Sequence, residues 1–297
     1  MTQNQTIESA ITALVTPFDQ NLEIDKKAWE QLLNLQAAGQ VDGVIISGTT
    51  GESPTLSERE YEYLIKSAKD RLHSSVKVWV GSGGNVTEKS IERSKKAEDL
   101  GADGLLLVTP YYNKPTQEGL KHHFTAISNS VDLPVILYNV PGRTATRIST
   151  DTIVELSKHP NIVATKEATG DMGQILDIIH RAGDQISVLS GDDAMTLPLI
   201  CAGGKGVVSV VANLVPGLMK TLVRDALEGK IEAARKNHHK LWPLMKASFF
   251  ESNPIPIKEA LYMAGIIQPN LRPPLTRLSE EYLDQLLQIL TDLNIID

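Results

Sequence analysis

The sequence has few of the features that mark secreted, membrane or nucleic-acid-binding proteins. It contains one cysteine, Cys201, in 297 residues, so no internal disulfide can form and a disulfide-stabilised fold is excluded. In the segment Leu199-Ile200-Cys201-Ala202 we predict that this cysteine is a small buried side chain. Residues 1–6 lack the basic start and apolar core of a signal peptide, and no apolar run is long enough to cross a membrane.

An excess of basic residues is also missing. Lysine and arginine number 29 against 36 aspartate and glutamate residues, which gives a net charge of −7. This balance argues against non-specific binding of nucleic acids, because a polyanion is held by a positively charged surface. We therefore expect a cytoplasmic protein whose partners include neither a nucleic acid nor a membrane.

Residues that could bind a metal or a phosphate are poorly placed. The pairs His122-His123 and His238-His239 fall in segments with helical spacing, where adjacent side chains point apart. Asp192-Asp193 fits a helix cap after a glycine turn better than a cation site. Ser82-Gly83-Gly84-Asn85 lacks the lysine of a P-loop and the glycine spacing of a dinucleotide site. We therefore expect neither a metal nor an organic cofactor.

Short apolar runs alternate with longer amphipathic segments along the chain. The runs are nearly continuous in Val, Ile and Leu, which is typical of parallel strands covered on both faces. Apolar residues make up 41% of the chain, enough for a large core. The eight predicted strands are Ile11–Val15, Val44–Ser47, Val76–Val80, Gly104–Val108, Val135–Asn139, Ile162–Lys166, Ser187–Ser190 and Val207–Val210.

Helix signals separate these runs. Residues 57–60 predict a capping box, and Gly39 and Gly101 stand where a helix-terminating glycine is expected. Eight strand–helix units favour a closed (β/α)₈ TIM barrel over an open doubly wound sheet, which usually has about five or six strands. We predict the barrel over residues 1–229 and a small C-terminal helical appendage, with no further strand, over residues 230–297.

In such a barrel the chemistry lies at the carboxyl ends of the strands. Lys166 ends the sixth run. A lysine that leaves the strand for water is the simplest interpretation, but burial would lower its pKa and free the amine to add to a ketone. Tyr138, on the neighbouring run, is a candidate for proton transfer or else a core tyrosine. Thr49 and Thr50 offer donors to a carboxylate, and Arg143 suits a second carboxylate unless it is simply solvated. Together they indicate a keto-acid site.

At these residues the chain resembles the dihydrodipicolinate (4-hydroxy-tetrahydrodipicolinate) synthase family of the pyruvate-dependent class I aldolase and lyase superfamily. Two threonines after Gly48 and an arginine after Val140-Pro141-Gly142 favour the synthases over the keto-sugar-acid lyases. The resemblance runs in order through nearly the whole chain. Its segments are Gly48-Thr49-Thr50-Gly51-Glu52-Ser53, Thr109-Pro110-Tyr111-Tyr112-Asn113, Tyr138-Asn139-Val140-Pro141-Gly142-Arg143-Thr144, Lys166-Glu167-Ala168-Thr169-Gly170, Ser190-Gly191-Asp192-Asp193 and Asn253-Pro254-Ile255-Pro256-Ile257-Lys258.

The resemblance implies that Lys166 forms an imine with pyruvate, whose enamine then attacks L-aspartate 4-semialdehyde in lysine and diaminopimelate biosynthesis. It implies a proton relay of Tyr138, Thr49 and Tyr112, the last reaching in from a neighbouring subunit of a homotetramer built from tight dimers. The sequence by itself supports only a symmetric dimer. No cofactor is implied. Substrate contacts would come from Thr50, Arg143, Val208 and Gly191.

The resemblance further implies an effector site for L-lysine at a dimer interface. Ser53, Asn85 and Tyr111 match that site. However, Glu58 and Tyr61 stand where histidines are expected, and Lys89 stands where a glutamate would accept the ammonium group of the effector. Since like charges repel, we expect weak or absent inhibition by lysine.

Two other interpretations of the site stay open. A lyase that cleaves a keto-sugar acid, of the N-acetylneuraminate lyase kind, would share the lysine and the tyrosine and differ in the acceptor pocket. A barrel that only binds a keto-acid would need no nucleophile, so a lysine, a tyrosine and an arginine at strand ends argue against it.

Overall fold

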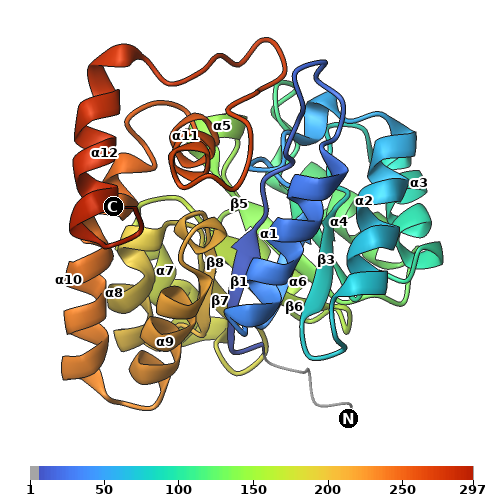
Figure 1. Cartoon of the computed structure of the whole chain (residues 1–297). Coiled ribbons are helices and arrows are strands. Elements are labelled where there is room, and N and C mark those ends of the chain that lie inside the picture. Colours follow the sequence, from blue (N-terminus) through green and yellow to red (C-terminus); the bar gives the residue numbers. More distant parts are fainter. Residues whose placement is uncertain (1–6, 297) are drawn as a thin grey trace.

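The computed structural model describes residues 7–296 and contains a closed barrel of parallel strands (Figure 1). Each strand pairs with its neighbours in the sequence, and β8 closes the barrel on β1. The strands are β1 (Ser9–Ala13), β2 (Gly43–Ile46), β3 (Lys77–Gly81), β4 (Gly104–Val108), β5 (Val135–Asn139), β6 (Ile162–Glu167), β7 (Ser187–Ser190) and β8 (Gly206–Ser209). The predicted (β/α)₈ barrel is therefore confirmed, with strand ends that agree to within two residues.

Helices alternate with the strands and cover the outside of the barrel. In α2 the capping box is confirmed, because Ser57 and Glu60 exchange side chain to backbone hydrogen bonds. The buried residues of α2 follow the spacing of a single helical face, which packs against the strands. The helices are α1 (Lys26–Ala38), α2 (Glu58–Arg71), α3 (Thr87–Asp99), α4 (Gln117–Ser128), α5 (Pro141–Thr144), α6 (Thr150–Leu156), α7 (Met172–Ala182), α8 (Thr196–Cys201) and α9 (Pro216–Leu227).

The two glycines expected to end helices behave differently. Gly101 follows α3 with a φ of 79°, the left-handed conformation expected at that place. Gly39 has a φ of −74°, and Gln40 takes the left-handed conformation instead. The helix α1 therefore ends at Gly39 as predicted, and only the left-handed conformation falls on the next residue. A Cβ atom at Gly39 would lie 2.6 Å from the side chain of Pro216, so close packing of α1 against α9 accounts for this glycine.

The chain continues past the barrel as helices, with no further strand among the described residues. These are α10 (Ile231–Ala247), α11 (Ile255–Met263) and α12 (Leu283–Asp292), which confirms the predicted helical appendage. In Figure 1, α10 and α12 lie side by side at one edge, and α11 lies near α5, above the strands. The appendage therefore reaches the strand ends where the site is expected.

Alternation along the strands sorts side chains between two apolar cores. On β5, Ile136 and Tyr138 belong to the core inside the barrel, whereas Val135 and Leu137 face the helices. On β6, Ala164 belongs to the inner core, which places Lys166, two residues further, on the same inner side.

Two further sequence predictions bear on the surface. Cys201 is exposed, so its predicted burial is wrong; it is the last residue of α8, whose preceding Leu199 and Ile200 take the buried positions. In residues 7–296 no helix is both long and apolar enough to span a membrane. The prediction about a signal peptide concerns residues 1–6, which lie outside the described residues.

Candidate active site

Lys166 and Tyr138 face each other at the carboxyl ends of β6 and β5. They are register partners across the two strands, and the Nζ atom of Lys166 lies 4.2 Å from the centroid of the Tyr138 ring. Both side chains are almost fully buried, with exposures of 5% and 6%. Lys166 is therefore buried inside the barrel, and the alternative of a lysine side chain that leaves the strand for water is wrong.

Burial changes the chemistry of both groups. The pKa of Lys166 is lowered to about 7, mainly because burial removes the amine from water; the charge of Asp193 opposes this shift and that of Arg143 adds to it. Near neutral pH a large share of Lys166 is thus a free amine, which can attack a carbonyl carbon. Burial raises the pKa of Tyr138, so its phenol stays protonated and can both donate and accept a proton.

The loop after β2 brings Thr49 and Thr50 to the site. A hydrogen bond links Thr49 to the Tyr138 hydroxyl and opposes the rise of its pKa. Ser47, where the loop begins, has a left-handed φ of 56°. A Cβ atom at Gly81, the last residue of β3, would lie 2.1 Å from the Ser47 carbonyl oxygen. Only glycine lets the loop close there, so β3 fixes the position of the two threonines.

Asn253, just before α11, connects two predicted site residues. Its Nδ2 atom donates to Thr50 Oγ1 at 2.9 Å, and its carbonyl oxygen accepts from Arg143 at 3.2 Å. Arg143 sits on the single turn of α5 that follows β5. In the sequence, Asn253 stands out only as part of a family segment. Its role depends on contacts with Thr50 and Arg143, which are 203 and 110 residues away along the chain. A pattern within a few residues of Asn253 cannot reveal such contacts.

Gly191 and Val208 also lie at the site. A Cβ atom at Gly191 would lie 3.0 Å from Lys166 Cε, so the backbone of this glycine packs directly on the lysine stem. Val208 is fully buried in the inner core, on β8. Tyr138, Arg143 and Gly191 thus lie close to Lys166. Thr49 is joined to Tyr138, Thr50 is joined to Arg143 through Asn253, and Val208 shares the inner core with Tyr138.

Tyr112 is not brought to this site. It is 89% exposed, has a left-handed φ of 73°, and does not line the cavity described below. Within one subunit it therefore has no contact with Lys166.

Asp193 is a site residue that sequence reasoning missed. Asp192 caps the short helix after β7, as expected, but Asp193 is buried and its Oδ2 atom accepts from the backbone N–H groups of Val210 and Val211. Its Oδ1 atom has no hydrogen-bond partner within the described part of the chain. The pKa of Asp193 is raised by burial, and its charge acts on Lys166. The expectation of a cap was wrong for this second aspartate.

A second polar cluster lies behind the two catalytic candidates, on the outer side of the strands. Glu167 accepts from Asn139 Nδ2 at 3.2 Å and from Thr165 Oγ1 at 2.8 Å. Burial raises the pKa of Glu167 to about 7. Since Asn139 and Glu167 follow Tyr138 and Lys166 directly, their hydrogen bond holds the register that places the tyrosine beside the lysine.

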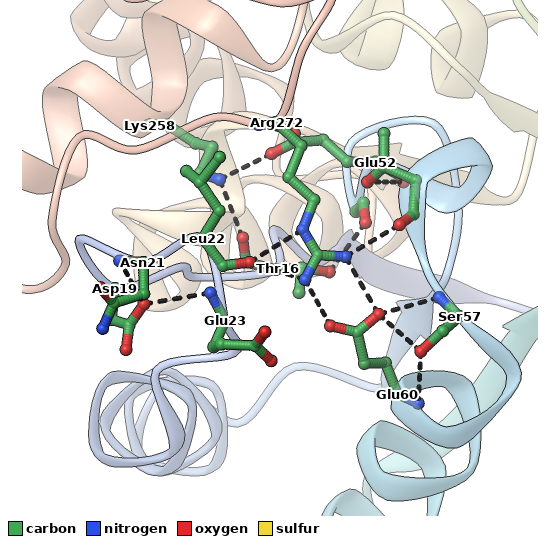
Figure 2. A network of polar contacts seen from close by, with 12 residues as sticks. Thr16, Asp19, Asn21, Leu22, Glu23, Glu52, Ser57, Glu60, Lys258 and Arg272 are labelled. Atoms are coloured by element: carbon green, nitrogen blue, oxygen red, sulfur yellow. Dashed lines mark hydrogen bonds and ion pairs between the residues drawn. The ribbon is translucent and has the colours of Figure 1, made fainter.

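Figure 2 shows the buried network that joins the β2 loop to the appendage. Lys258 of α11 donates to Glu52 at 2.6 Å and to the Thr16 carbonyl at 2.9 Å, and both members of the ion pair are fully buried. The backbone N–H of Arg272 donates to the other Glu52 oxygen, and its guanidinium pairs with Glu60. Glu52, only two residues after Thr50, is thereby anchored on the C-terminal helices.

A cavity of about 510 Å³ opens beside these residues. It extends from Thr49, Tyr138 and Arg143 to the ends of β2 and β3 and to the first turns of α3. The predicted effector-site residues Ser53, Asn85 and Tyr111 line it, together with Lys89; Glu58 and Tyr61 do not.

The histidine pairs behave as expected of helical neighbours. His122 is exposed beside Glu118, whereas His123 is buried and shares a hydrogen bond with Thr87 Oγ1 at 2.9 Å. Over residues 7–296, no group of three or more potential metal-ligating side chains could hold an ion. The polar groups of the site are those of amine, hydroxyl and carboxylate chemistry.

Comparisons with a family model, with curated proteins and with solved structures all find dihydrodipicolinate synthases. The model of the dihydrodipicolinate synthetase family matches residues 6–293. A 4-hydroxy-tetrahydrodipicolinate synthase of Methanocaldococcus jannaschii is 49% identical over 96% of this chain and 98% of that protein. The dihydrodipicolinate synthase structure from Aquifex aeolicus has a TM-score of 0.94 at 44% identity, covering 97% and 99% of the two chains. A dihydrodipicolinate synthase variant described as monomeric has a TM-score of 0.95 at 42% identity over 98% of each chain.

Proposed function

The chain belongs to the dihydrodipicolinate synthetase family, and we propose from this membership and from its site that it acts as a 4-hydroxy-tetrahydrodipicolinate synthase. It is a lyase that condenses pyruvate with L-aspartate 4-semialdehyde, a step of lysine and diaminopimelate biosynthesis. A single observation supports the chemistry best: Lys166 is buried against Tyr138 with a pKa of about 7. An amine in that state forms an imine with a ketone at neutral pH.

Each step follows from this amine. The Nζ atom of Lys166 attacks the ketone carbon of pyruvate, and water leaves as the imine forms. Loss of a methyl proton gives an enamine, whose carbon bonds to the aldehyde carbon of the semialdehyde while the aldehyde oxygen takes up a proton. The amine of the joined product then adds to the imine carbon, releases Lys166 and closes the ring.

Hydroxyl groups move the protons in these steps. Tyr138 and Thr49 are hydrogen-bonded to each other and lie at the lysine. A chain of hydroxyls passes protons in both directions without holding a charge, which suits a reaction with several proton transfers.

The carboxylates of the substrates need separate donors. Thr50 binds the carboxylate of pyruvate, and Arg143, exposed at the cavity, binds that of the semialdehyde. Asn253 holds both residues in place. The backbones of Val208 and Gly191 contact the bound pyruvate.

The exposure of Tyr112 supports a shared site. Tyr112 of the partner subunit completes the relay, and the assembly is a homotetramer made of tight dimers. The monomeric variant among the relatives makes the oligomeric state a matter for direct measurement. The net charge of −7 and the single cysteine support a location in the cytoplasm.

Borohydride reduction tests the imine. In the presence of pyruvate, the wild-type enzyme should gain one pyruvyl group on Lys166 by mass spectrometry. Lys166→Ala should gain none and lose turnover with its circular dichroism unchanged, since removing a desolvated amine does not unfold the barrel. Lys95→Ala, which removes an exposed lysine of α3, is the control. Turnover by Lys166→Ala would refute the assignment, and cleavage of N-acetylneuraminate in place of condensation would favour the lyase alternative.

A further inference from the structure

One end of the cavity carries only positive charge. The charged side chains that line the whole cavity are Lys89, Arg93 and Arg143, and no aspartate or glutamate of the described residues is among its lining. Lys89 and Arg93 of α3 lie at this end, away from Arg143. The charge of the cavity lining is thus positive although the net charge of the whole chain is −7. None of the three forms an ion pair with a carboxylate within residues 7–296, whereas many other lysines and arginines do. The positive charge of the cavity is therefore uncompensated.

Arg93 is held in a fixed position at this end. Its guanidinium lies 4.3 Å from the ring centroid of Tyr61, and one terminal nitrogen donates to Ser47 Oγ at 3.0 Å. Its Nε atom is buried and has no hydrogen-bond partner among the described residues. A buried donor without a partner costs free energy, and a ligand that accepts from it removes that cost.

Lys89 stands beside it. The two residues are four apart on α3, so both side chains emerge on the same face of the helix. Ser53 and Asn85, which also line this end, add a hydroxyl and an amide. Two cations a helical turn apart, with neutral donors around them, match a ligand with two negative charges.

We propose that this outer end of the cavity, between α3 and the loop after β2, binds a small dianion, either a short dicarboxylate or inorganic phosphate. It is distinct from the inner end, where Arg143 and the threonines serve the substrates. This end is positively charged, whereas a site for a cationic amino acid would need a carboxylate to accept its ammonium group.

Occupation of the outer end also acts on the catalytic loop. Arg93 donates to Ser47, which shares a hydrogen bond of 3.0 Å with Ser53 and directly precedes the turn that carries Thr49. A dianion that draws the Arg93 guanidinium to itself weakens the bond to Ser47. The loop then loses a support, so the dianion inhibits turnover. The inhibition of turnover rests on the proposed function, whereas the binding of the dianion does not.

Calorimetric titration with sodium succinate and with sodium phosphate, at fixed ionic strength, tests the site. Lys89→Glu should weaken binding of the dianion at least about tenfold, because a charge-assisted contact becomes a repulsion. Lys95→Glu, on an exposed position of the same helix outside the cavity, carries the same change of charge and should bind as the wild type does. Arg143→Ala should also bind normally, and acetate should bind more weakly than either dianion.

Other outcomes overturn the proposal. If neither dianion binds, or if Lys89→Glu binds as well as Lys95→Glu does, the outer end is not an anion site. If Arg143→Ala alone loses binding, the anion occupies the substrate end. The same anions should inhibit condensation by the wild type and by Lys95→Glu, and not by Lys89→Glu. If the dianion binds but does not inhibit in this pattern, the proposed effect on turnover is refuted, whereas the proposed binding site stands.

Discussion

The reactivity of Lys166 depends on which side of β6 it occupies. Alternation along the strand directs it into the barrel, and there the walls remove the water that would stabilise an ammonium ion. Glu167, the next residue, faces the opposite side and has no access to the cavity side of the strand. A shift of one residue in the strand would exchange the amine for the carboxyl and abolish the site.

Imine formation should follow the protonation of Lys166. With a pKa of about 7, the ammonium form dominates below that pH and cannot attack, so the rate of borohydride-trapped adduct formation should rise between about pH 6 and 8. Because the charge of Asp193 raises this pKa, Asp193→Asn should move the midpoint to lower pH. A rate independent of pH over this range, or a midpoint that moves upward in the variant, would contradict the assignment.

Inhibition by L-lysine should be weak or absent. Lys89 and Arg93 line the predicted effector site and Glu58 does not, so the ammonium group of the effector meets cations. Loss of one charge-assisted contact and gain of repulsion costs about 2–4 kcal/mol, or roughly 30–1000-fold in affinity. A coupled assay of wild type and Lys89→Glu measures this, and the variant should be the more sensitive of the two. Strong inhibition of the wild type at sub-millimolar lysine would show the inference to be wrong.

At the scale of elements, the loop after β2 is supported by parts of the chain that are distant in sequence. Figure 2 shows Glu52 between Lys258 and the backbone of Arg272, while the Phe18 ring lies 4.4 Å from Lys258 Nζ and 4.2 Å from the Arg272 guanidinium. Three segments therefore meet at one buried ion pair. The C-terminal helices thus take part in forming the active site.

Breaking this pair should destabilise the protein strongly. Lys258→Met leaves Glu52 as a buried charge without its partner and should cost about 3–5 kcal/mol in urea unfolding. Arg235→Met, which breaks the exposed pair with Glu232 on α10, should cost less than about 1 kcal/mol. Adding Glu52→Gln to Lys258→Met should recover part of the loss, because the uncompensated charge is removed. Equal effects of the two single changes would contradict this account.

At the scale of the whole molecule, one subunit brings together only part of the proposed relay. Tyr112 projects into solvent while Tyr138 and Thr49 lie at Lys166. The shared site is a proposal that only an assembly can test. The division of the chain at residues 229 and 230 likewise stays a prediction, since α10 packs directly on α9.

Mixed subunits should reveal a shared site. Tyr112→Phe and Lys166→Ala should each have low activity alone. If they are co-refolded, half of the dimers contain one of each, and one of the two sites in such a dimer has both an intact Lys166 and an intact Tyr112. About a quarter of the wild-type activity should then return. No recovery, or a fully active monomer in sedimentation under assay conditions, would exclude the cross-subunit role.

The sequence by itself determined the barrel and the core of the site. Strands buried on both faces must be continuous in apolar residues, so their number and their ends are visible locally, and the carboxyl ends of parallel strands must meet at one edge. Lys166, Tyr138, Thr49, Thr50 and Arg143 can thus be grouped from the sequence alone. The prediction of burial failed at Cys201, because a single position at the end of a helix decides whether a side chain is buried or exposed.

Only the tertiary structure decided what supports and surrounds that core. Asn253 bridges Thr50 and Arg143, Lys258 neutralises Glu52, and Arg93 stacks on Tyr61 beside the cavity. These partners are far apart along the chain, by 206 residues for Lys258 and Glu52. Periodicity and turn signals report interactions within a few residues, whereas a buried charge is stabilised by whichever group the folded chain brings next to it.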